Sequence, residues 1–574
     1  MMRNTITALI LVITVLFFLG CKEQTRGSEG VVSEQIRLNQ IGYYPIFIKK
    51  AVVVGVVEAT EFELIEAKSG KNVFSADLSE ARKWELSGEE VRIADFTDFN
   101  EEGTYQLAIA GIGQSYPFEI GKHILQAPFL GSVKGLYYQR ASMALDEKFA
   151  GKWHRAAGHP DDSVSFHPSS GRTDGFLVSP KGWYDAGDYG KYVLNASFPL
   201  GQFYTLYEEY PEAIIDGDLN IPESGNGRSD YLDELKYEMD WVLTMQDEDG
   251  GMFHKLTTKG FEGMVMPDKA VSTRYVIGKG TGSTLDFAAM AAQAYRVFQT
   301  SDQDYANTCL VASRKAYQWA KDNPDVAFKN PEDISTGEYG DDDFSDEFFW
   351  AASELFVSTG DQQYLDHLKE EQLDFEMKPG DGWRRYMRFL GMFSLLRNPE
   401  NVPDELLQKI RSGILASADD LVSKALEQEY FQPIDDFQWG SNSDVLNAAM
   451  IMAHAYRINP DKKYLFGAQQ AVDYILGNNA VGYSFLSGFG DKTPMFLHHR
   501  PSAADGIEES VPGLLSGGPN SRLQDASNGV VYPENVAPMK AWVDQEPSYA
   551  SNEICLNWNA PLTYVLGFLE QESN

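Results

Sequence analysis

The hydrophobic pattern of this chain changes its period once, and this change limits the possible folds more than any other feature. Across residues 36–120, short stretches alternate apolar and polar side chains, as in EFELI (61–65), with turn signals between them. Such alternation predicts short β-strands with one buried face. From about residue 123 onward, apolar residues recur three or four positions apart. The sequence therefore predicts a small β-sandwich followed by a large helical domain.

The helical region repeats one kind of segment. In SDYLDELKYEMDWVLTMQ (229–246), Leu232, Leu235, Met239 and Val242 fall on one face of a helix. No strong strand runs stand between the segments, and no tight sequence repeat of solenoid length is visible. We expect a mainly α fold in which about 450 residues form one toroidal α/α domain. The other segments of this kind are 285–298, 346–356, 384–396, 444–458, 464–476 and 560–570.

The first 20 residues have the features of a targeting signal. Arg3 precedes an apolar run (residues 6–19) that is too short for a stable membrane span. Gly20-Cys21 then resembles a bacterial lipobox, although Phe18 stands where Leu is usual. We expect cleavage before Cys21, lipidation of Cys21, a tether over 21–34, and a secreted protein anchored to the outer membrane, on its periplasmic or its outer face. The alternative is an ordinary secretory signal with an incidental cysteine.

Composition narrows the possible partners. The formal net charge is −36, which argues against binding nucleic acid or anionic headgroups because both need Lys and Arg patches. A neutral polymer suits this surface better. The 29 Tyr, 33 Phe and 10 Trp residues belong mostly to the core, and some could stack on sugar rings. Cys309 and Cys555 make no disulfide framework, so we expect both to be free and buried.

Two aspartates stand three residues apart in KGWYDAGDYGKYV (181–193). Asp185 and Asp188 flank a turn that contains Gly187. Because two like charges held close repel, such a pair needs either solvation or a function. The alternative interpretation is a calcium-binding or capping turn.

A third carboxyl group stands near the opposite end of the chain, in WVDQEPSYASNEICLNWNAP (542–561). Glu553 lies among apolar and aromatic neighbours, and desolvation would raise its pKa toward that of a general acid. An ordinary glutamate at a helix start is the alternative. His498 and Arg500, in FLHHRPS (496–502), are good donors to hydroxyl groups. An ionised pair with a protonated acid indicates glycoside hydrolysis, provided that a closed ring of helices brings the two ends together.

These stretches resemble glycoside hydrolase family 9. DAGDYGKYV is similar to the family's aspartate motif, SFLSGFGDKTPMFLHHR (484–500) to its histidine signature, and the segment around Glu553 to its acid signature. Cys555 departs conservatively from the usual small residue. IRLNQIGYYPIFIKKAVVV (36–54) resembles the immunoglobulin-like module that precedes the catalytic domain in one branch of the family. The resemblance covers nearly the whole mature chain.

The resemblance implies an immunoglobulin-like β-sandwich over 35–121 and an (α/α)6 barrel over 122–574. It also implies an inverting mechanism, in which the acid and the base stand about 6.5–9.5 Å apart. Asp188 would be the general base, Asp185 would help to hold the water, and Glu553 would be the general acid. The implied sugar-contacting residues are His254, His498, Arg500 and Trp558.

No cofactor for the chemistry is implied, but a structural calcium ion is. GEYGDDDFSDEFFWAA (337–352) resembles the family's calcium site, with Asp342, Asp346, Glu347 and Asp381 as ligands. The alternative is a helix N-terminus whose acidic residues interact with the dipole.

Taken together, the sequence predicts a monomeric, lipid-anchored endo-β-1,4-glucanase that acts on cellulose-like β-glucans, including mixed-linkage glucan or xyloglucan. An exo-acting member, such as a β-glucosaminidase or a cellobiohydrolase-like enzyme, is one alternative, because the long 151–181 loop could close one end of a cleft. A glycan-binding lipoprotein without catalytic activity, which would pass glycan to a transporter, is the other.

Overall fold

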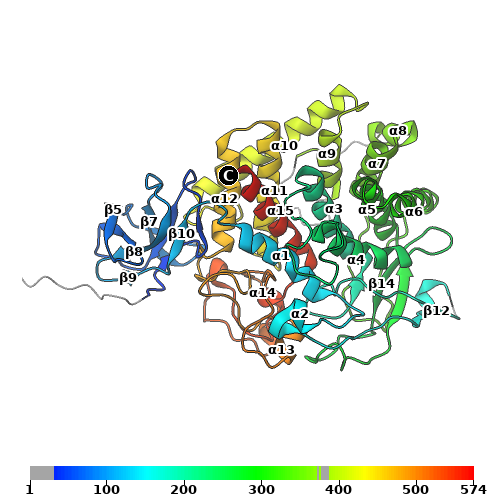
Figure 1. Cartoon of the computed structure of the whole chain (residues 1–574), viewed down its shortest axis with the longest axis horizontal. Coiled ribbons are helices and arrows are strands. Elements are labelled where there is room, and N and C mark those ends of the chain that lie inside the picture. Colours follow the sequence, from blue (N-terminus) through cyan, green and yellow to red (C-terminus); the bar gives the residue numbers. More distant parts are fainter. Residues whose placement is uncertain (1–31, 173, 371–373, 377–386, 574) are drawn as a thin grey trace, which may run out of the picture.

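A computed structural model describes residues 32–172, 174–370, 374–376 and 387–573 of the chain. It consists of a small β module beside a much larger helical domain (Figure 1). The lipidation candidate Cys21 and the calcium-ligand candidate Asp381 lie outside the described residues. Among the helices of the described part, none is long and apolar enough to cross a membrane.

The N-terminal module is a sandwich of two sheets with its own hydrophobic core. Along the strand EFELIE, Phe62 and Leu64 point into this core, while Glu61, Glu63 and Glu66 face solvent, as the alternating pattern predicts. One sheet has the order β1 (Ile36–Arg37), β3 (Lys50–Val54), β7 (Glu89–Asp95), β6 (Arg82–Trp84). The other has the order β2 (Gly42–Tyr43), β10 (Phe118–Ile120), β8 (Gly103–Ile109), β4 (Glu61–Glu66), β5 (Asn72–Asp77), with β9 (Gly113–Gln114) paired to β8.

The helical domain is a double ring. Its six inner helices are almost wholly buried, and the ring closes where the last helix packs on the first inner helix, α15 on α3. The inner helices are α3 (Val193–Glu209), α5 (Thr281–Phe298), α7 (Ser345–Thr359), α9 (Met387–Arg397), α11 (Ser441–Ile458) and α15 (Leu556–Glu572). The outer helices are α1 (Gln126–Gln139), α4 (Asp230–Thr244), α6 (Gln303–Asp322), α8 (Gln362–Glu370), α10 (Asp404–Glu427) and α12 (Lys462–Ile475).

The periodic segments predicted from the sequence correspond to helices, within a few residues at their ends. Two inner helices were harder to predict, because α3 contains Pro199 and α15 contains Pro561, and proline is usually excluded from helix interiors. The segment 193–209 was therefore not predicted as a helix, and α15 begins four residues before the predicted segment. Tertiary burial on all sides outweighs the local signal in both helices.

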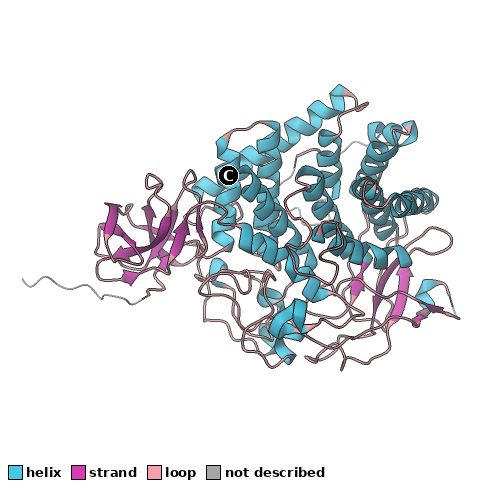
Figure 2. Cartoon of the chain, in the orientation of Figure 1, coloured by secondary structure: helices cyan, strands magenta, loops and turns pink. Residues whose placement is uncertain are grey.

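The expectation that no strands stand between the helices was wrong. A five-stranded sheet with the order β12-β11-β15-β14-β13 lies within the helical domain (Figure 2). Its strands are short and mix polar with apolar residues, as in FHKLT, so they carry little periodic signal. They are β11 (Val164–Phe166), β12 (Phe176–Leu177), β13 (Lys191–Tyr192), β14 (Phe253–Thr257) and β15 (Tyr275–Lys279).

The module and the barrel share polar contacts at their junction. The side chain of Gln40 donates to the carbonyl oxygen of Gly482 at 3.1 Å and accepts from the main-chain N–H of Lys492 at 2.8 Å. Nearby, Asn39 donates to the buried carboxyl group of Asp473 at 2.8 Å. The module therefore contacts the segment 482–492, which leads directly toward His498.

Candidate active site

The long loops gather at one end of the barrel, at the lower edge of Figure 1, with the short helices α13 (Arg500–Ala504) and α14 (Tyr549–Asn552). The inner helices α3 and α15 begin at this end, directly after residues 185–192 and 553–555. A cavity of about 360 Å³ opens here. It is lined by Asp185, Ala186, Asp188, Tyr192, Phe261, Gly337, Glu338, Tyr339, Trp439, Glu553, Cys555, Asn557 and Trp558.

The aspartate loop, residues 185–190, is fixed through its main chain. The N–H of Asp185 donates to the carbonyl oxygen of Gly190 at 3.0 Å, and the N–H of Leu556 donates to the carbonyl oxygen of Asp185, also at 3.0 Å. Gly187 allows a close approach between the chain ends, since a β-carbon there would lie 2.0 Å from the carbonyl oxygen of His498 and 3.2 Å from Oε1 of Glu553. This loop therefore sets Asp185, Asp188 and Glu553 around one cavity, as the closed ring predicted.

Asp185 is the more deeply buried of the two aspartates. Its carboxyl oxygens accept hydrogen bonds from the Tyr339 hydroxyl at 2.7 Å and from the side-chain amide of Asn195. Burial, and then the nearby Asp188 carboxylate, raise the pKa of Asp185 to about 8. At neutral pH Asp185 therefore favours its protonated form when Asp188 is charged.

Asp188 lies in a more polar environment. One of its oxygens accepts from the main-chain N–H of Gly190 at 3.1 Å and from the Tyr192 hydroxyl at 3.4 Å. Burial raises its pKa, while the guanidinium groups of Arg500 and Arg274 act in the opposite direction. Of the two aspartates, Asp188 is therefore the one whose surroundings favour the carboxylate.

Glu553 faces the same cavity from the start of the last helix. Its main chain is held by the N–H of Gly517, which donates to the Glu553 carbonyl oxygen at 2.8 Å, and by a parallel bridge to His498. Burial first, and then Asp188, raise the pKa of its side chain well above the ordinary value. This shift favours the protonated form of Glu553, which is the state that a proton donor needs.

The predicted sugar-contacting residues differ in their positions. Trp558 lines the cavity, whereas His254, His498 and Arg500 are not among its lining residues. The His254 ring stacks on Phe328 and bonds the carbonyl oxygen of Glu338 at 2.9 Å. His498 lies behind Glu553 and bonds a main-chain carbonyl oxygen through Nδ1 at 2.7 Å.

Arg500 supports the aspartate loop. Its NH1 donates to the Gly187 carbonyl oxygen at 2.7 Å, and its Nε donates to that of Glu262 at 2.9 Å. Because both contacts are to main-chain oxygens, the histidine-signature segment holds the loop in place, and the Arg500 charge acts on Asp188 from beneath the cavity.

Sequence reasoning missed several lining side chains. Phe261 and Trp439 leave 54% and 45% of their surface exposed at the cavity, which suits rings that stack on a sugar. Tyr339 has a left-handed backbone, with φ of 46°, which aims its hydroxyl at Asp185. An aromatic residue in a glycine-rich loop was the only signal for Tyr339, and Trp439 had the same signal beside Gly440.

The predicted calcium ligands do not come together as a set in the described residues. Asp346 and Glu347, at the start of α7, are buried, and each has an oxygen without a hydrogen-bond partner. Their carboxyl groups and that of Asp286 in α5 repel one another when charged, which raises their pKa values. Asp342 is exposed. Within the described part of the chain, no group of three or more His, Cys, Asp or Glu side chains is arranged to hold a metal ion. Cys309 and Cys555 are free and buried, as expected.

Comparison with known families places two domains on this chain. Residues 128–566 match the model of glycosyl hydrolase family 9, and residues 31–114 match that of the cellulase N-terminal Ig-like domain. The two matches follow the boundary between the sandwich and the helical double ring.

Individual relatives extend over almost the whole chain. It is 39% identical over 570 residues to the xyloglucan-specific endo-beta-1,4-glucanase BoGH9A of Bacteroides ovatus, covering 95% of each chain. Endoglucanase D of Acetivibrio thermocellus is 34% identical over 553 residues, covering 94% of this chain and 84% of that one. A solved structure described as Bacteroides ovatus GH9 superposes with a TM-score of 0.87 at 37% identity, over 95% of this chain and 100% of the other.

Proposed function

Because this chain belongs to glycosyl hydrolase family 9, we propose that Asp185, Asp188 and Glu553 hydrolyse β-1,4-glucosidic bonds by inversion. The protein is a glycoside hydrolase with an endo-β-1,4-glucanase function. The observation that carries the residue assignment is the meeting of the buried Asp185 and Asp188 with the partly buried Glu553 at one cavity that exposed aromatic rings also line.

The proposed chemistry divides the work among the three carboxyl groups. Glu553, kept protonated by its surroundings, gives its proton to the departing glycosidic oxygen. Asp188, the aspartate favoured as a carboxylate, takes a proton from the attacking water on the opposite face of the sugar ring. Asp185, fixed by Tyr339 and Asn195, helps to hold that water. No cofactor takes part in these steps.

The aromatic residues supply the binding surface. Trp439, Phe261 and Trp558 offer ring faces around the carboxyl groups, and an apolar sugar face can lie against such rings. His254, His498 and Arg500 stay predicted sugar contacts. To contact them, a bound sugar would have to extend beyond the residues that line the cavity.

The mode of action is tested with the sandwich and barrel together, without the N-terminal signal and tether, on a soluble β-1,4-glucan. Solution viscosity and released reducing ends are followed together. An endo-acting enzyme cuts inside chains, so viscosity falls steeply while few reducing ends appear. A rise in reducing ends with viscosity almost unchanged would favour the exo-acting alternative and would contradict the assignment.

Xyloglucan is the substrate that we propose to examine first. The support is the printed specificity of the Bacteroides ovatus relative, which matches this chain over nearly its full length. Initial rates on xyloglucan, mixed-linkage glucan, unbranched cello-oligosaccharides and chitosan oligomers would rank the substrates. A preference for unbranched chains over xyloglucan would refute the proposal.

We further propose that the mature protein is a monomer anchored to the outer membrane by lipid at Cys21. The lipobox-like Gly20-Cys21 after an apolar run supports this. Metabolic labelling with a radioactive fatty acid should mark the native protein but not Cys21→Ser, and the variant should lose membrane association. Equal labelling of both proteins would exclude Cys21 as the lipidated residue.

A structural calcium ion beside the start of α7 is a further proposal. The unpartnered buried oxygens of Asp346 and Glu347 suit a hard cation, and such a cation would relieve their repulsion with Asp286. Chelation should then lower the melting temperature, and calcium but not magnesium should restore it. An unchanged melting temperature after chelation would count against the site.

A further inference from the structure

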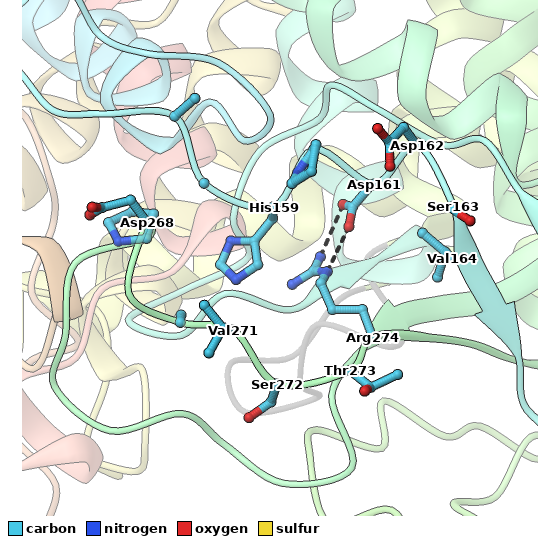
Figure 3. Close-up of a pocket in the computed structure, with 15 residues that line it drawn as sticks. His159, Asp161, Asp162, Ser163, Val164, Asp268, Val271, Ser272, Thr273 and Arg274 are labelled. Carbon is cyan, nitrogen blue, oxygen red and sulfur yellow. Dashed lines mark hydrogen bonds and ion pairs between the residues drawn. The ribbon is translucent and has the colours of Figure 1, made fainter.

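Arg274 is a buried cation that bonds the aspartate loop at Tyr189. It precedes β15 and forms part of the wall of a second cavity, of about 350 Å³. Figure 3 shows its guanidinium group facing the carboxylate of Asp161, with the His159 imidazole beside them. Arg274 is not among the residues that line the active-site cavity.

The contacts of Arg274 join two loops. Its Nε lies 2.9 Å from Oδ1 of Asp161, and its NH2 donates to Oδ2 of the same carboxylate at 3.3 Å. Its NH1 donates to the carbonyl oxygen of Tyr189 at 2.6 Å. Because Tyr189 directly follows Asp188, this bond fixes the main chain next to the proposed base.

Asp161 is well placed to orient Arg274. Its carboxylate also contacts Nζ of Lys191 at 2.8 Å, and Lys191 in turn donates to the carbonyl oxygens of Ser179 at 3.1 Å and Lys181 at 2.8 Å. Asp161 has a left-handed backbone, with φ of 48°. One buried carboxylate thus pairs with two cations: Arg274 bonds the aspartate loop at Tyr189, and Lys191 bonds the chain before that loop.

Several charged groups act on Asp188. Asp185 and Glu553 are its acidic neighbours, and the Tyr192 hydroxyl bonds it. On the cationic side, Arg500 reaches it from α13, Lys255 from β14, and Arg274 from the segment before β15. Arg500 touches the loop at Gly187 and Arg274 touches it at Tyr189, so the two guanidinium groups hold the main chain on either side of Asp188.

We propose that Arg274 is a positioning residue for the aspartate loop: oriented by Asp161, it holds the Tyr189 carbonyl oxygen and supplies positive charge that favours the carboxylate of Asp188. The proposal rests on the proposed role of Asp188 as the base. It assigns the Asp161–Arg274 pair a role in activity from outside the substrate cavity.

The test is the pH profile of kcat/KM on a soluble β-glucan, whose acid limb reports protonation of the Asp185–Asp188 pair. Arg274→Gln removes a cation that lowers the pKa of Asp188, so the acid limb should move upward by about half a pH unit or more. Arg274→Lys keeps the positive charge but loses the planar guanidinium group that bonds Asp161 and Tyr189 together. The acid limb of its pH profile should stay near that of the unmodified enzyme, while kcat falls.

Lys269→Gln is the matched control. Lys269 lies in the same loop, but its side chain is exposed and pairs only with Asp268 among the described residues. Solvent and salt screen such a charge, so removing it should leave the acid limb in place. A limb that moves equally in Lys269→Gln and Arg274→Gln would indicate a general charge effect and would overturn the proposal.

A structural role alone predicts a different result for Arg274→Gln, namely lower kcat and lower melting temperature with an unmoved acid limb. That result would also overturn the proposal. Arg274→Gln leaves the buried Asp161 carboxylate with Lys191 as its remaining cation of the pair. If Arg274→Gln does not fold for this reason, the double variant Asp161→Asn/Arg274→Gln removes that carboxylate as well. The limb of the double variant should still move upward, because Arg274 bonds Tyr189, the residue directly after Asp188, whereas Asp161 contacts Arg274 and Lys191.

A wrong assignment of Asp188 as the base would give a result that can be distinguished from a wrong role for Arg274. If Asp188 is not the base, Asp188→Ala keeps most of its activity, whatever Arg274 does. If Asp188→Ala loses activity while the limb of Arg274→Gln stays in place, the base assignment stands and only the role of Arg274 fails.

Discussion

The main-chain N–H of Leu556 donates to the carbonyl oxygen of Asp185 at 3.0 Å, which joins the first residue of the last helix to the aspartate loop. Ala186 and Cys555 form a β-bridge beside this bond. The proposed catalytic arrangement therefore depends on closure of the helical ring, since neither end of the chain holds all three carboxyl groups.

Glu553→Gln should lower kcat about 10³-fold, because the amide cannot protonate the leaving oxygen. Oligosaccharide binding, measured by calorimetry, should change little, since the side chain keeps its size. Glu546→Gln is the control, because only the main chain of Glu546 bonds His498. Turnover of Glu553→Gln close to that of the unmodified enzyme would disprove the acid assignment.

The two aspartates should differ in their response to azide. Asp188→Ala removes the proposed base, and azide, which needs no deprotonation, should restore part of the lost rate and yield a glycosyl azide. Asp185→Ala should show little rescue, because its loss disturbs only the holding of the water. Chromatography of the products distinguishes the two. Strong rescue of Asp185→Ala alone would reverse the roles.

Inversion fixes the anomer of the first product. A β-linked glucan should release the α-anomer at its new reducing end. Proton NMR spectra recorded in the first minutes, before mutarotation, should show that signal growing first. An initial β-anomer would mean retention, with one aspartate acting as a nucleophile.

Asp185→Asn should stabilise the fold most at alkaline pH. Burial and Asp188 raise the pKa of Asp185 to about 8 in the folded state, above its unfolded value. The protonated Asp185 side chain stabilises the fold fully only below its unfolded pKa of about 4, and this stabilisation is lost as pH rises from there toward 8. Melting temperatures should therefore be closest near pH 4, and the variant should melt higher at pH 9. A gain at pH 4 with none at pH 9 would refute this.

Gly187→Ala should abolish most activity. The added β-carbon would lie 2.0 Å from the carbonyl oxygen of His498, the residue that is bridged to Glu553, so the aspartate loop would have to move away from both. Gly263→Ala is the control, because its β-carbon would meet nothing within 4 Å. We expect a kcat loss well over tenfold in Gly187→Ala only, measured with folding monitored by circular dichroism.

The sequence predicted those features that depend on period or on long motifs. The helices α5 and α11 follow from apolar spacing, and the three carboxyl groups follow from their signatures. The family and its sandwich module were identified on residues that the family models also match.

Other features depend on tertiary geometry. The contact of Tyr339 with Asp185 needs an unusual backbone angle in a loop, and α3 forms around Pro199 because every side of it is buried. Arg500 has the residue type of a sugar ligand, yet its guanidinium group holds main-chain oxygens. Local sequence cannot distinguish these two uses of one side chain.

The junction at Gln40 has a consequence for how this enzyme can be divided. The side chain of Gln40 bonds both ends of the segment 482–492, and the chain continues from there to Arg500, which bonds Gly187 of the aspartate loop. The sandwich therefore supports, through this segment, the chain that leads to the proposed active site. We expect a barrel expressed without the sandwich to lose this support, so that full activity requires both domains together.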